Sequence, residues 1–534
     1  MERTLGHVGL FRPGDLGGVV YSYFGNIINF IIIAYALQGI GWPDSIIYGR
    51  VIPGLAVGLM FGCLAYAWQG YRLAKKTGRK DVTALPSGVS TPAMFVYLYG
   101  VIYPLHYSGL SPEMCWMAAT AACFLGGFIE MLGGFIGPFI RRLIPRVAML
   151  GTVAGIGLVW MATAGLFEVY HDPILGMPVV VIAIIGLIGG YVFKKRIPML
   201  LVSVVFGIVW ALFLGRVQVD TSTLGVSLPV LSIGAVFQGF KYIIPFLSVI
   251  IPIEVYNFIE TMDNVESAIA AGDEYNVGQT QIIDGVCTMV SALFGSIVPN
   301  TVWLGHAGLK KSETGISYSW ISAILYALSS VFGLYGFMNS LMPAVVASIT
   351  FLWCAMLMLV QAYTDVPRRH GAALAIALIP HLADALYTYV RDALGAFGIY
   401  LEETLTMNST DEISQAMITY GVVWKGVVAM HSGAIITSIL WATVVAFIID
   451  RRLDKASIAF VVASVLSFFG FIHSPALVVG VATMSFPYAV GYLLAAVICY
   501  AIHLGHKKIM DVPRRYDYVD RKSTRLNSSH VALS

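Results

Sequence analysis

Charged residues are scarce in this chain of 534 residues. Asp, Glu, Lys and Arg make up 11% of it, whereas hydrophobic residues make up 58%, and the mean hydropathy is +0.80. A soluble domain carries roughly 25% charged residues, and even a soluble protein with a very large core needs polar faces along its helices. Most apolar stretches here lack such faces, so the composition predicts a polytopic membrane protein. The formal net charge of +3 gives no reason to expect a nucleic-acid partner.

Motifs of enzymes and ATP-driven pumps are also missing. The sequence has no HExxH pair, no nucleophile elbow and no Walker motif, which argues against an enzyme of those classes and against direct use of ATP. Its 6 cysteines form no CxxC pair and show no Cys/His spacing typical of a metal site. We therefore expect no enzymatic activity, no cofactor and no metal.

Long apolar stretches dominate instead, and a membrane-spanning helix needs about 20 such residues. They lie near 16–40, 51–71, 84–103, 113–139, 146–168, 174–193, 198–215, 240–262, 277–298, 299–309, 316–336, 340–363, 371–391, 428–449, 455–473 and 480–504. We group them as seven segments in 16–216, seven in 240–450 and a hairpin in 451–505. This predicts an all-α polytopic membrane protein of two repeats plus an extra hairpin.

Lysine and arginine alternate between the connecting loops, which predicts the orientation. Clusters follow the second, fourth and sixth segments and recur in every second loop of the later half, apart from the acidic loop 263–276. Since positive residues stay on the cytoplasmic side, both termini should be cytoplasmic and the acidic stretch 401–412 should lie outside. The protein is thus expected in the cytoplasmic membrane, surrounded by lipid.

The last residues have a different origin. "DRKSTRLNSSH", residues 520–530, matches the translation of a common sequencing adapter codon for codon. We therefore interpret residues 520–534 as an artefact rather than as part of the natural chain.

Two apolar segments contain proline, glycine and polar residues where a continuous helix would be expected. They read "TALPSGVSTPAMFVYLYG" (83–100) and "VPNTVWLGHAG" (298–308). Irregular backbone at membrane depth survives only where protein or a water-filled cavity covers it, and two such breaks in matching positions mark a transporter's binding site. Each is the third segment of its set, and the second lies seven places after the first, an odd number, so they run in opposite directions. This predicts an inverted repeat with two half-helices that meet at a polar site; the alternative is two merely kinked helices.

One helix places acids in an apolar stretch. In "IPIEVYNFIETMDNVESAIAAGDE" (251–274), Glu260, Asn264 and Ser267 share a helical face. A charge inside the bilayer costs about 3 kcal/mol on insertion scales and is a functional hypothesis by default; the alternative is that Glu260 lies at the helix end. For the other embedded ionisable residues we favour structural hydrogen bonds over substrate contacts. They are Glu130, Asp284, Asp384 and His431.

Together "LPSGVSTP", "RRLIP" with "GTV", the embedded "IET" and "VPNT..G..G" resemble the nucleobase–cation symporter family of xanthine, uracil and guanine/hypoxanthine permeases. The resemblance implies seven plus seven inverted segments, a core domain that moves against a gate domain in an elevator-like motion, and proton symport. It implies that Glu260 binds the nucleobase and the coupling proton, with Asn264 beside it. The half-helix residues expected at the substrate are Ser87, Gly88, Val89, Ser90, Thr301, Val302, Trp303 and Leu304.

The sequence departs from that family where uracil-type members have "YGEN" and this chain has "WLGH", so that Gly305 replaces an acid and His306 an asparagine. Trp303 is the candidate for stacking on a flat ring, and its alternative role is packing. The leading hypothesis is a proton-coupled permease for a purine, xanthine or uracil. The alternative is a transporter of sulfate, bicarbonate or a carboxylate on the same architecture, against which the negative charge of Glu260 argues unless it is protonated. A homodimer is compatible with either hypothesis.

The topology yields a direct test. A cysteine introduced at Asn408, in the acidic stretch 401–412, should react with an impermeant thiol reagent added to intact cells. Labelling that occurs only after the cells are permeabilised would reject the predicted orientation.

Overall fold

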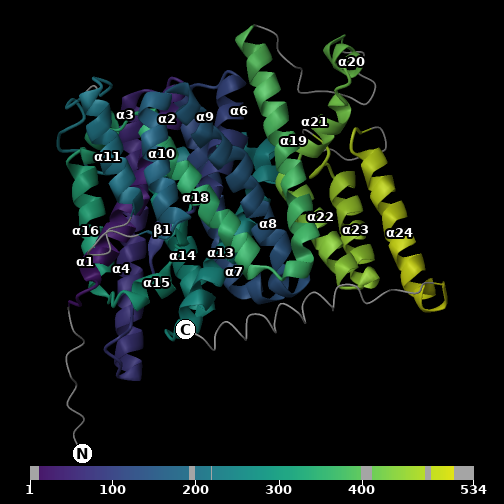
Figure 1. Cartoon of the computed structure of the whole chain (residues 1–534), viewed down its shortest axis with the longest axis horizontal. Coiled ribbons are helices and arrows are strands. Elements are labelled where there is room, and N and C mark those ends of the chain that lie inside the picture. Colours follow the sequence, from purple (N-terminus) through teal and green to yellow (C-terminus); the bar gives the residue numbers. More distant parts are fainter. Residues whose placement is uncertain (1–10, 192–198, 218, 398–411, 475–482, 510–534) are drawn as a thin grey trace, which may run out of the picture. The chain divides into compact units, whose positions relative to one another are not determined.

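The computed structural model describes residues 11–191, 199–217, 219–397, 412–474 and 483–509, and so leaves out the stretch 401–412 almost entirely and the tail 520–534 (Figure 1). The chain divides into two compact units. The first consists of Met1–Leu143 and Val153–Leu359, and the second of Ile144–Thr152 and Val360–Ser534. Each unit is described by itself.

The first unit is helical except for two short strands. Its elements are α1 (Asp15–Val19), η1 (Val20–Phe24), α2 (Gly25–Gly39), α3 (Asp44–Ile46), η2 (Ile47–Val51), α4 (Ile52–Thr77), β1 (Ser87–Val89), α5 (Thr91–Tyr97), η3 (Leu98–Ile102), α6 (Tyr103–Tyr107), α7 (Pro112–Leu143), η4 (Gly157–Ala162), α9 (Thr163–His171), α10 (Pro173–Leu187), α11 (Met199–Phe213), α12 (Ile233–Ile243), η6 (Ile244–Phe246), α13 (Leu247–Ala270), α14 (Val277–Leu293), β2 (Asn300–Val302), α15 (His306–Lys311), α16 (Ser317–Val331) and α17 (Leu334–Leu341). Helices α8 (Arg146–Ile156) and α18 (Ala344–Asp365) continue from one unit into the other.

The second unit contains the C-terminal helices. They are η7 (Arg368–His370), α19 (Gly371–Ala396), α20 (Glu412–Thr419), α21 (Trp424–His431), α22 (Ala434–Ile449), α23 (Leu453–Phe468) and α24 (Phe486–Ile509). The last two helices lie side by side (Figure 1), where the Ser457 hydroxyl donates to the Ala496 carbonyl (2.8 Å) and the Ser464 hydroxyl to the Ala489 carbonyl (2.7 Å). The expected hairpin of 451–505 corresponds to this pair.

Length and apolar composition qualify 7 helices in the described ranges as membrane spans, or up to 10 if each sharply bent helix pair counts as one. Two of these bends change the expected segments. The segment expected at 240–262 is preceded by α12, which meets α13 at 102° beyond Pro245, and the one expected at 428–449 is split at 90° beside Gly433 (φ +78°). Because proline removes a helical hydrogen bond and glycine adopts positive φ freely, both residues end helices.

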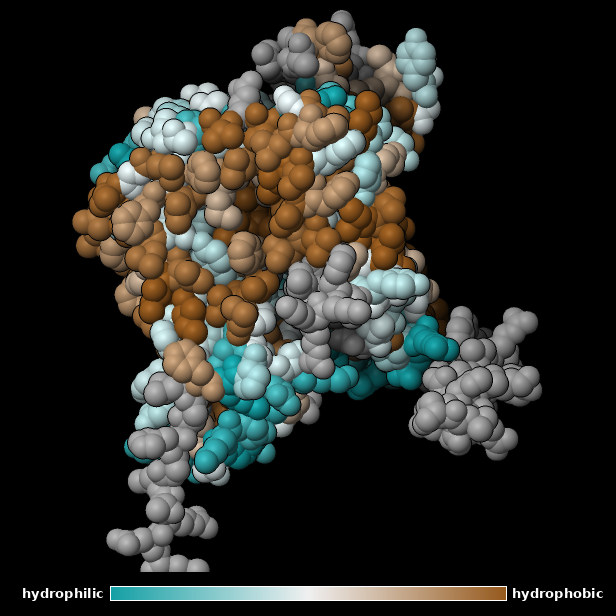
Figure 2. All heavy atoms as spheres, turned by 60° about the vertical axis from the view of Figure 1, so that its left-hand side comes forward, coloured by the Kyte–Doolittle hydropathy of each residue, from teal (hydrophilic) through white to brown (hydrophobic). Residues whose placement is uncertain are grey.

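Apolar side chains also cover the outside of the first unit. Figure 2 shows hydrophobic residues across the middle of the visible face and hydrophilic ones along its lower edge. Phe135, Tyr191 and Phe213 are 70%, 69% and 79% exposed. Exposed aromatic and aliphatic side chains on this scale need an apolar solvent, which the lipid bilayer provides. The expected all-α, multi-pass fold is confirmed.

The two broken segments pair with each other, as expected for an inverted repeat. Strands β1 and β2 are antiparallel, with Ser87 opposite Val302, Gly88 opposite Thr301 and Val89 opposite Asn300. The pairing continues on both sides, because the Ser90 amide donates to the Pro299 carbonyl (3.1 Å) and the Trp303 amide to the Pro86 carbonyl (2.8 Å). Each segment thereby supplies the backbone partners that the other lost by leaving the helical conformation.

Glycines allow helices to approach closely around this pair. On α7, a Cβ at Gly127 would lie 2.7 Å from the Gly285 carbonyl oxygen of α14, and a Cβ at Gly285 would lie 2.5 Å from the Gly127 oxygen. On the adjacent face of α7, Gly126 and Gly133 make similar room for Glu254 and Phe258 of α13. Small residues at helix contacts are how membrane helices pack without a hydrophobic driving force between them.

The glycine contact predicts the effect of a single methyl group. Gly285→Ala should destabilise the protein by about 1–3 kcal/mol, the cost of overpacking a filled interior, and should lower its melting temperature. Gly491→Ala is the matched control, since Gly491 is also helical and nothing lies within 4 Å of the added Cβ. Equal melting temperatures for the two variants would contradict the close packing of α7 and α14.

Candidate functional site

The candidate site is built around the β1–β2 pair, which lies on helix α4. Three glycines of α4 at four-residue spacing face the broken segments and their flanks. A Cβ at Gly54 would lie 2.3 Å from the Ser296 amide, one at Gly58 2.7 Å from Asn300 Nδ2, and one at Gly62 2.3 Å from Ser87 Oγ. Sequence reasoning missed this support, although the G-x3-G-x3-G spacing at 54–62 is visible in the chain.

Asparagine side chains hold the two strands from either side. Asn26 of α2 accepts from the Val89 amide (2.9 Å) and donates to the Ser87 carbonyl (3.2 Å). On α13, the Asn257 amide group donates to the Asn300 carbonyl (3.1 Å) and that of Asn264 to the Val302 carbonyl (2.7 Å). Asn264, which was predicted to contact the substrate, therefore holds β2 by a hydrogen bond, and Asn26 and Asn257 hold the strands in the same way.

Glu260 reaches the first of the two half-helices. Ser90 directly precedes α5, and its hydroxyl donates to Glu260 Oε2 at 3.1 Å. Tyr256, one turn earlier on α13, also hydrogen-bonds to this carboxyl group. The structure therefore brings together two of the predicted residues, Glu260 and Ser90, at the N-terminal end of α5, where partial positive charge accumulates.

Trp303 occupies a packed position. Its ring lies against Gly25 and Gly88, where an added Cβ would come within 2.4 Å and 2.6 Å of it, and its centroid is 5.3 Å from that of Tyr21. The Tyr21 hydroxyl donates to the Leu304 carbonyl (2.7 Å). These contacts favour the packing role of Trp303 over stacking on a substrate.

The departure from the expected "YGEN" pattern has a backbone reason. Gly305 has a φ of +101°, and a Cβ there would lie 2.4 Å from the Tyr21 hydroxyl. A glutamate at this position would therefore be both strained and crowded. The following His306 is buried and turns to Asp273, with 3.1 Å between Nε2 and Oδ2.

Three buried carboxylates lie on α13 and its neighbours α7 and α14. Glu254 accepts from the Tyr97 hydroxyl (2.5 Å), while Glu130 and Asp284 share the Thr261 hydroxyl at 3.1 and 2.8 Å. These hydrogen bonds agree with the structural role that the sequence favoured for Glu130 and Asp284. In the second unit, His431 Nδ1 lies 2.5 Å from Asp384 Oδ1, which also fits that expectation.

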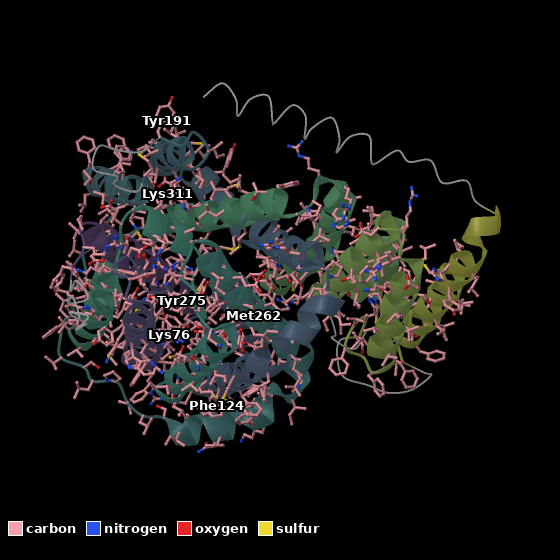
Figure 3. The ribbon with its side chains drawn as sticks, turned by 90° about the horizontal axis from the view of Figure 1, so that it is seen from below. Lys76, Phe124, Tyr191, Met262, Tyr275 and Lys311 are labelled. Atoms are coloured by element: carbon pink, nitrogen blue, oxygen red, sulfur yellow. The ribbon has the colours of Figure 1, made fainter. Side chains whose placement is uncertain are left out.

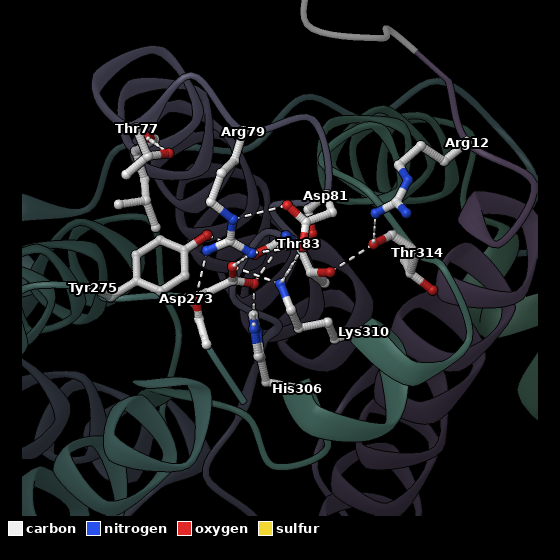
Figure 4. Close-up of polar contacts among 12 residues, drawn as sticks. Arg12, Thr77, Arg79, Asp81, Thr83, Asp273, Tyr275, His306, Lys310 and Thr314 are labelled. Atoms are coloured by element: carbon white, nitrogen blue, oxygen red, sulfur yellow. Dashed lines mark hydrogen bonds and ion pairs between the residues drawn. The ribbon is translucent and has the colours of Figure 1, made fainter. Parts of the chain in front are cut away.

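A polar cluster surrounds Asp273 in the loop after α13 (Figure 4). Asp273 accepts from the Thr83 amide (3.1 Å) and from Lys310 Nζ (2.6 Å), and it also contacts Arg79 and His306. The Arg79 guanidinium, which also bonds to Asp81, lowers the pKa of Asp81 to about 2. Asp81 therefore stays ionised at neutral pH. Viewed from below, Tyr275 of the same loop lies among the helices of the first unit (Figure 3), and its hydroxyl donates to the Thr83 carbonyl (2.6 Å).

A separate cavity of about 360 Å³ lies elsewhere in the first unit, lined by Tyr35, Tyr48, Arg216 and Asn339 among others. None of the predicted site residues lines it. Its polar walls carry both signs of charge, and Arg216 already pairs with Asp172. The cavity is thus distinct from the β1–β2 site.

Comparison with known proteins gives only distant structural neighbours. No family model and no curated protein matches the sequence. Among solved structures, the transmembrane domain of the cyanobacterial bicarbonate transporter BicA is 14% identical with a TM-score of 0.48, covering 70% of this chain and 96% of that one. SLC26A9 is 12% identical with a TM-score of 0.49, covering 69% of this chain and 62% of that one.

The family resemblance stated from the sequence is wrong. Neither of these neighbours is a nucleobase permease by its description, and no family model or curated relative supports the nucleobase–cation symporter family. The expected purine, xanthine and uracil substrates are withdrawn with it. The misleading motifs, "LPSGVSTP" and "VPNT", encode the paired broken segments, which are a property of the fold rather than of one substrate.

The position of Trp303 predicts the effect of its removal. Trp303→Ala should lower the melting temperature and abundance, at a cost below the roughly 3–5 kcal/mol typical of a fully buried Trp, because Trp303 is only half-buried. Thermal melting of the purified variant measures the loss of stability. The control is Trp68→Ala, since Trp68 is 53% exposed. Unchanged stability combined with weakened substrate affinity would assign Trp303 to the substrate instead.

Proposed function

We propose that this protein is a secondary active transporter that moves a small monovalent anion, such as bicarbonate or a short carboxylate, together with a proton. The observation that carries the proposal is the contact between Glu260 and Ser90 at the start of α5. A carboxyl group that can gain or lose a proton stands there at the positive end of a half-helix.

The protonation state of Glu260 would decide whether an anion can bind. When Glu260 is ionised, its own charge occupies the positive end of α5 and repels a second anion. When Glu260 is protonated, that repulsion disappears, and the backbone amides of the first turn and the Ser90 hydroxyl become available to the anion. Binding of the proton and of the anion then favour each other, which is the thermodynamic requirement of symport.

Electroneutrality supports the pairing of one proton with one monovalent anion. Moving a single net charge across the membrane costs about 2.3 kcal/mol per 100 mV, whereas a proton and a monovalent anion carry no net charge together. The site also lacks a described lysine or arginine in contact with Glu260, so the proton itself supplies the compensating charge.

The alternative is an anion site in which Glu260 takes no part. The Glu260–Ser90 contact argues against it, because an ionised carboxylate at the end of α5 would compete with every anion that approaches. The two hypotheses differ in pH dependence: only the first requires a proton gradient for uphill uptake.

Glu260→Gln tests the proposal in proteoliposomes. The variant keeps a side chain of the same size that can accept from Ser90, but it cannot exchange a proton. An inward proton gradient should drive accumulation of labelled bicarbonate, formate or acetate by the unmodified protein, and Glu260→Gln should abolish accumulation while anion exchange continues without pH dependence.

The matched control is Glu274→Gln, since Glu274 lies exposed just beyond the same helix. It should accumulate the anion as the unmodified protein does. Accumulation by Glu260→Gln at the unmodified rate and with the same pH dependence would contradict the proposal.

A further inference from the structure

Two carboxylates lie fully buried beside β2, outside the Glu260 contact. Glu130 of α7 and Asp284 of α14 are both 0% exposed. Their helices meet at the contact between Gly127 and Gly285. Gly127 lies three residues before Glu130, and Gly285 lies one residue after Asp284. The backbone therefore forces the two acids together.

No opposite charge compensates the two acids. In the described part of the chain, no ion pair joins either carboxylate to a lysine, arginine or histidine. The titratable groups that interact with the pair come from α4, α5, α7, α13 and α14. Each of them is neutral when protonated and negative when ionised, so none can supply a positive charge. They are Tyr66, Tyr97, Cys123, Glu254, Glu260 and Cys287. Two adjacent carboxylates in such surroundings cannot both be ionised.

The hydrogen bonds around Thr261 indicate where the proton resides. The Thr261 hydroxyl lies 3.1 Å from Glu130 Oε1, 2.8 Å from Asp284 Oδ2 and 3.0 Å from Thr301 Oγ1. A hydroxyl has one proton to donate and two lone pairs that accept. If both carboxylates were ionised, both would need that one proton.

A proton on Glu130 satisfies every one of these contacts. Glu130 then donates to Thr261, Thr261 donates to Asp284, and Thr301 donates to the second lone pair of Thr261. Asp284 Oδ2 also accepts from the Val302 amide (2.9 Å), and an ionised oxygen accepts two hydrogen bonds far better than a protonated one does.

We infer that Glu130, Thr261 and Asp284 form a proton-binding site in which Glu130 carries the proton and Asp284 the negative charge. The site is linked to the broken segments, because Asp284 holds the Val302 amide and Thr261 holds Thr301, both in β2. Loss of the Glu130 proton would place two negative charges around Thr261 and remove one of the bonds in this chain. The assignment of a proton stands on the geometry alone; only its participation in transport rests on the proposed function.

Infrared spectroscopy of the full-length reconstituted protein at neutral pH tests the assignment. A protonated carboxyl group gives a C=O stretching band that shifts when water is exchanged for D2O. We expect Glu130→Gln to lose one such band and Glu260→Gln to retain it. A Glu130→Gln spectrum with every carboxylic band of the unmodified protein would overturn the inference.

A second variant keeps the test decisive if Glu130→Gln does not fold. Thr261→Val has nearly the same shape but cannot accept from Glu130, so the Glu130 band should shift to higher frequency. An unshifted band would show that Glu130 does not donate to Thr261. Replacement of sodium by choline should leave the band unchanged, and a band that emerges only without sodium would identify a metal cation instead of a proton.

Measurements of melting temperature and of transport distinguish a failure of this inference from a failure of the proposed function. Glu130→Gln should melt at the same temperature as the unmodified protein, because glutamine is neutral and can donate to Thr261, whereas Asp284→Asn should melt lower. Loss of accumulation in Glu260→Gln with an intact band pattern in Glu130→Gln would leave the proposed function standing and reject the proton site. The reverse result would reject the proposed function and retain the proton site.

Discussion

The β1–β2 pairing satisfies a constraint on which the rest of the first unit depends: backbone that leaves the helix inside a bilayer must find other hydrogen-bond partners. The two broken segments meet this need by pairing with each other over Ser87–Val89 and Asn300–Val302. Because the partners come from opposite halves of the sequence, neither segment can form its half of the site alone. The pairing positions Ser90 at the start of α5, and therefore the contact with Glu260.

The residues around the pair divide into those that hold it and those that make room for it. Asn26, Asn257 and Asn264 hold the strands by their amide groups. The glycines of α4 make room for the backbone, and the Gly127–Gly285 contact brings α7 and α14 together. In this membrane protein, polar side chains and small residues thus stabilise the packing of the helices, whereas burial of large apolar side chains stabilises a soluble core.

Much of this architecture could be predicted from the sequence, and the reasons are physical. Proline and glycine inside "LPSGVSTP" and "VPNTVWLG" cannot continue a helix, so both breaks and their opposite directions followed from segment counting. Glu260 could be singled out as a candidate because an acid in an apolar helix is costly. Pair interactions were missed: the Asp273 cluster and the Glu130–Thr261–Asp284 contacts join residues far apart in the chain, and single residues such as Asp273 carry no local signal of their partners. The substrate class was misjudged because motifs that encode a backbone break do not encode what binds at it.

Asp273 has a mechanical consequence for any conformational change. Its carboxylate accepts a hydrogen bond from the amide of Thr83, which leads into β1. It also hydrogen-bonds to the side chains of His306 and Lys310, which lie on α15 after β2. One side chain therefore ties together the entry of one broken segment and the exit of the other. With β1–β2 joined at one end and Asp273 at the other, the two arms form a closed loop of contacts that resists relative sliding. A conformational change of this unit that preserves these contacts would displace both arms as one rigid body.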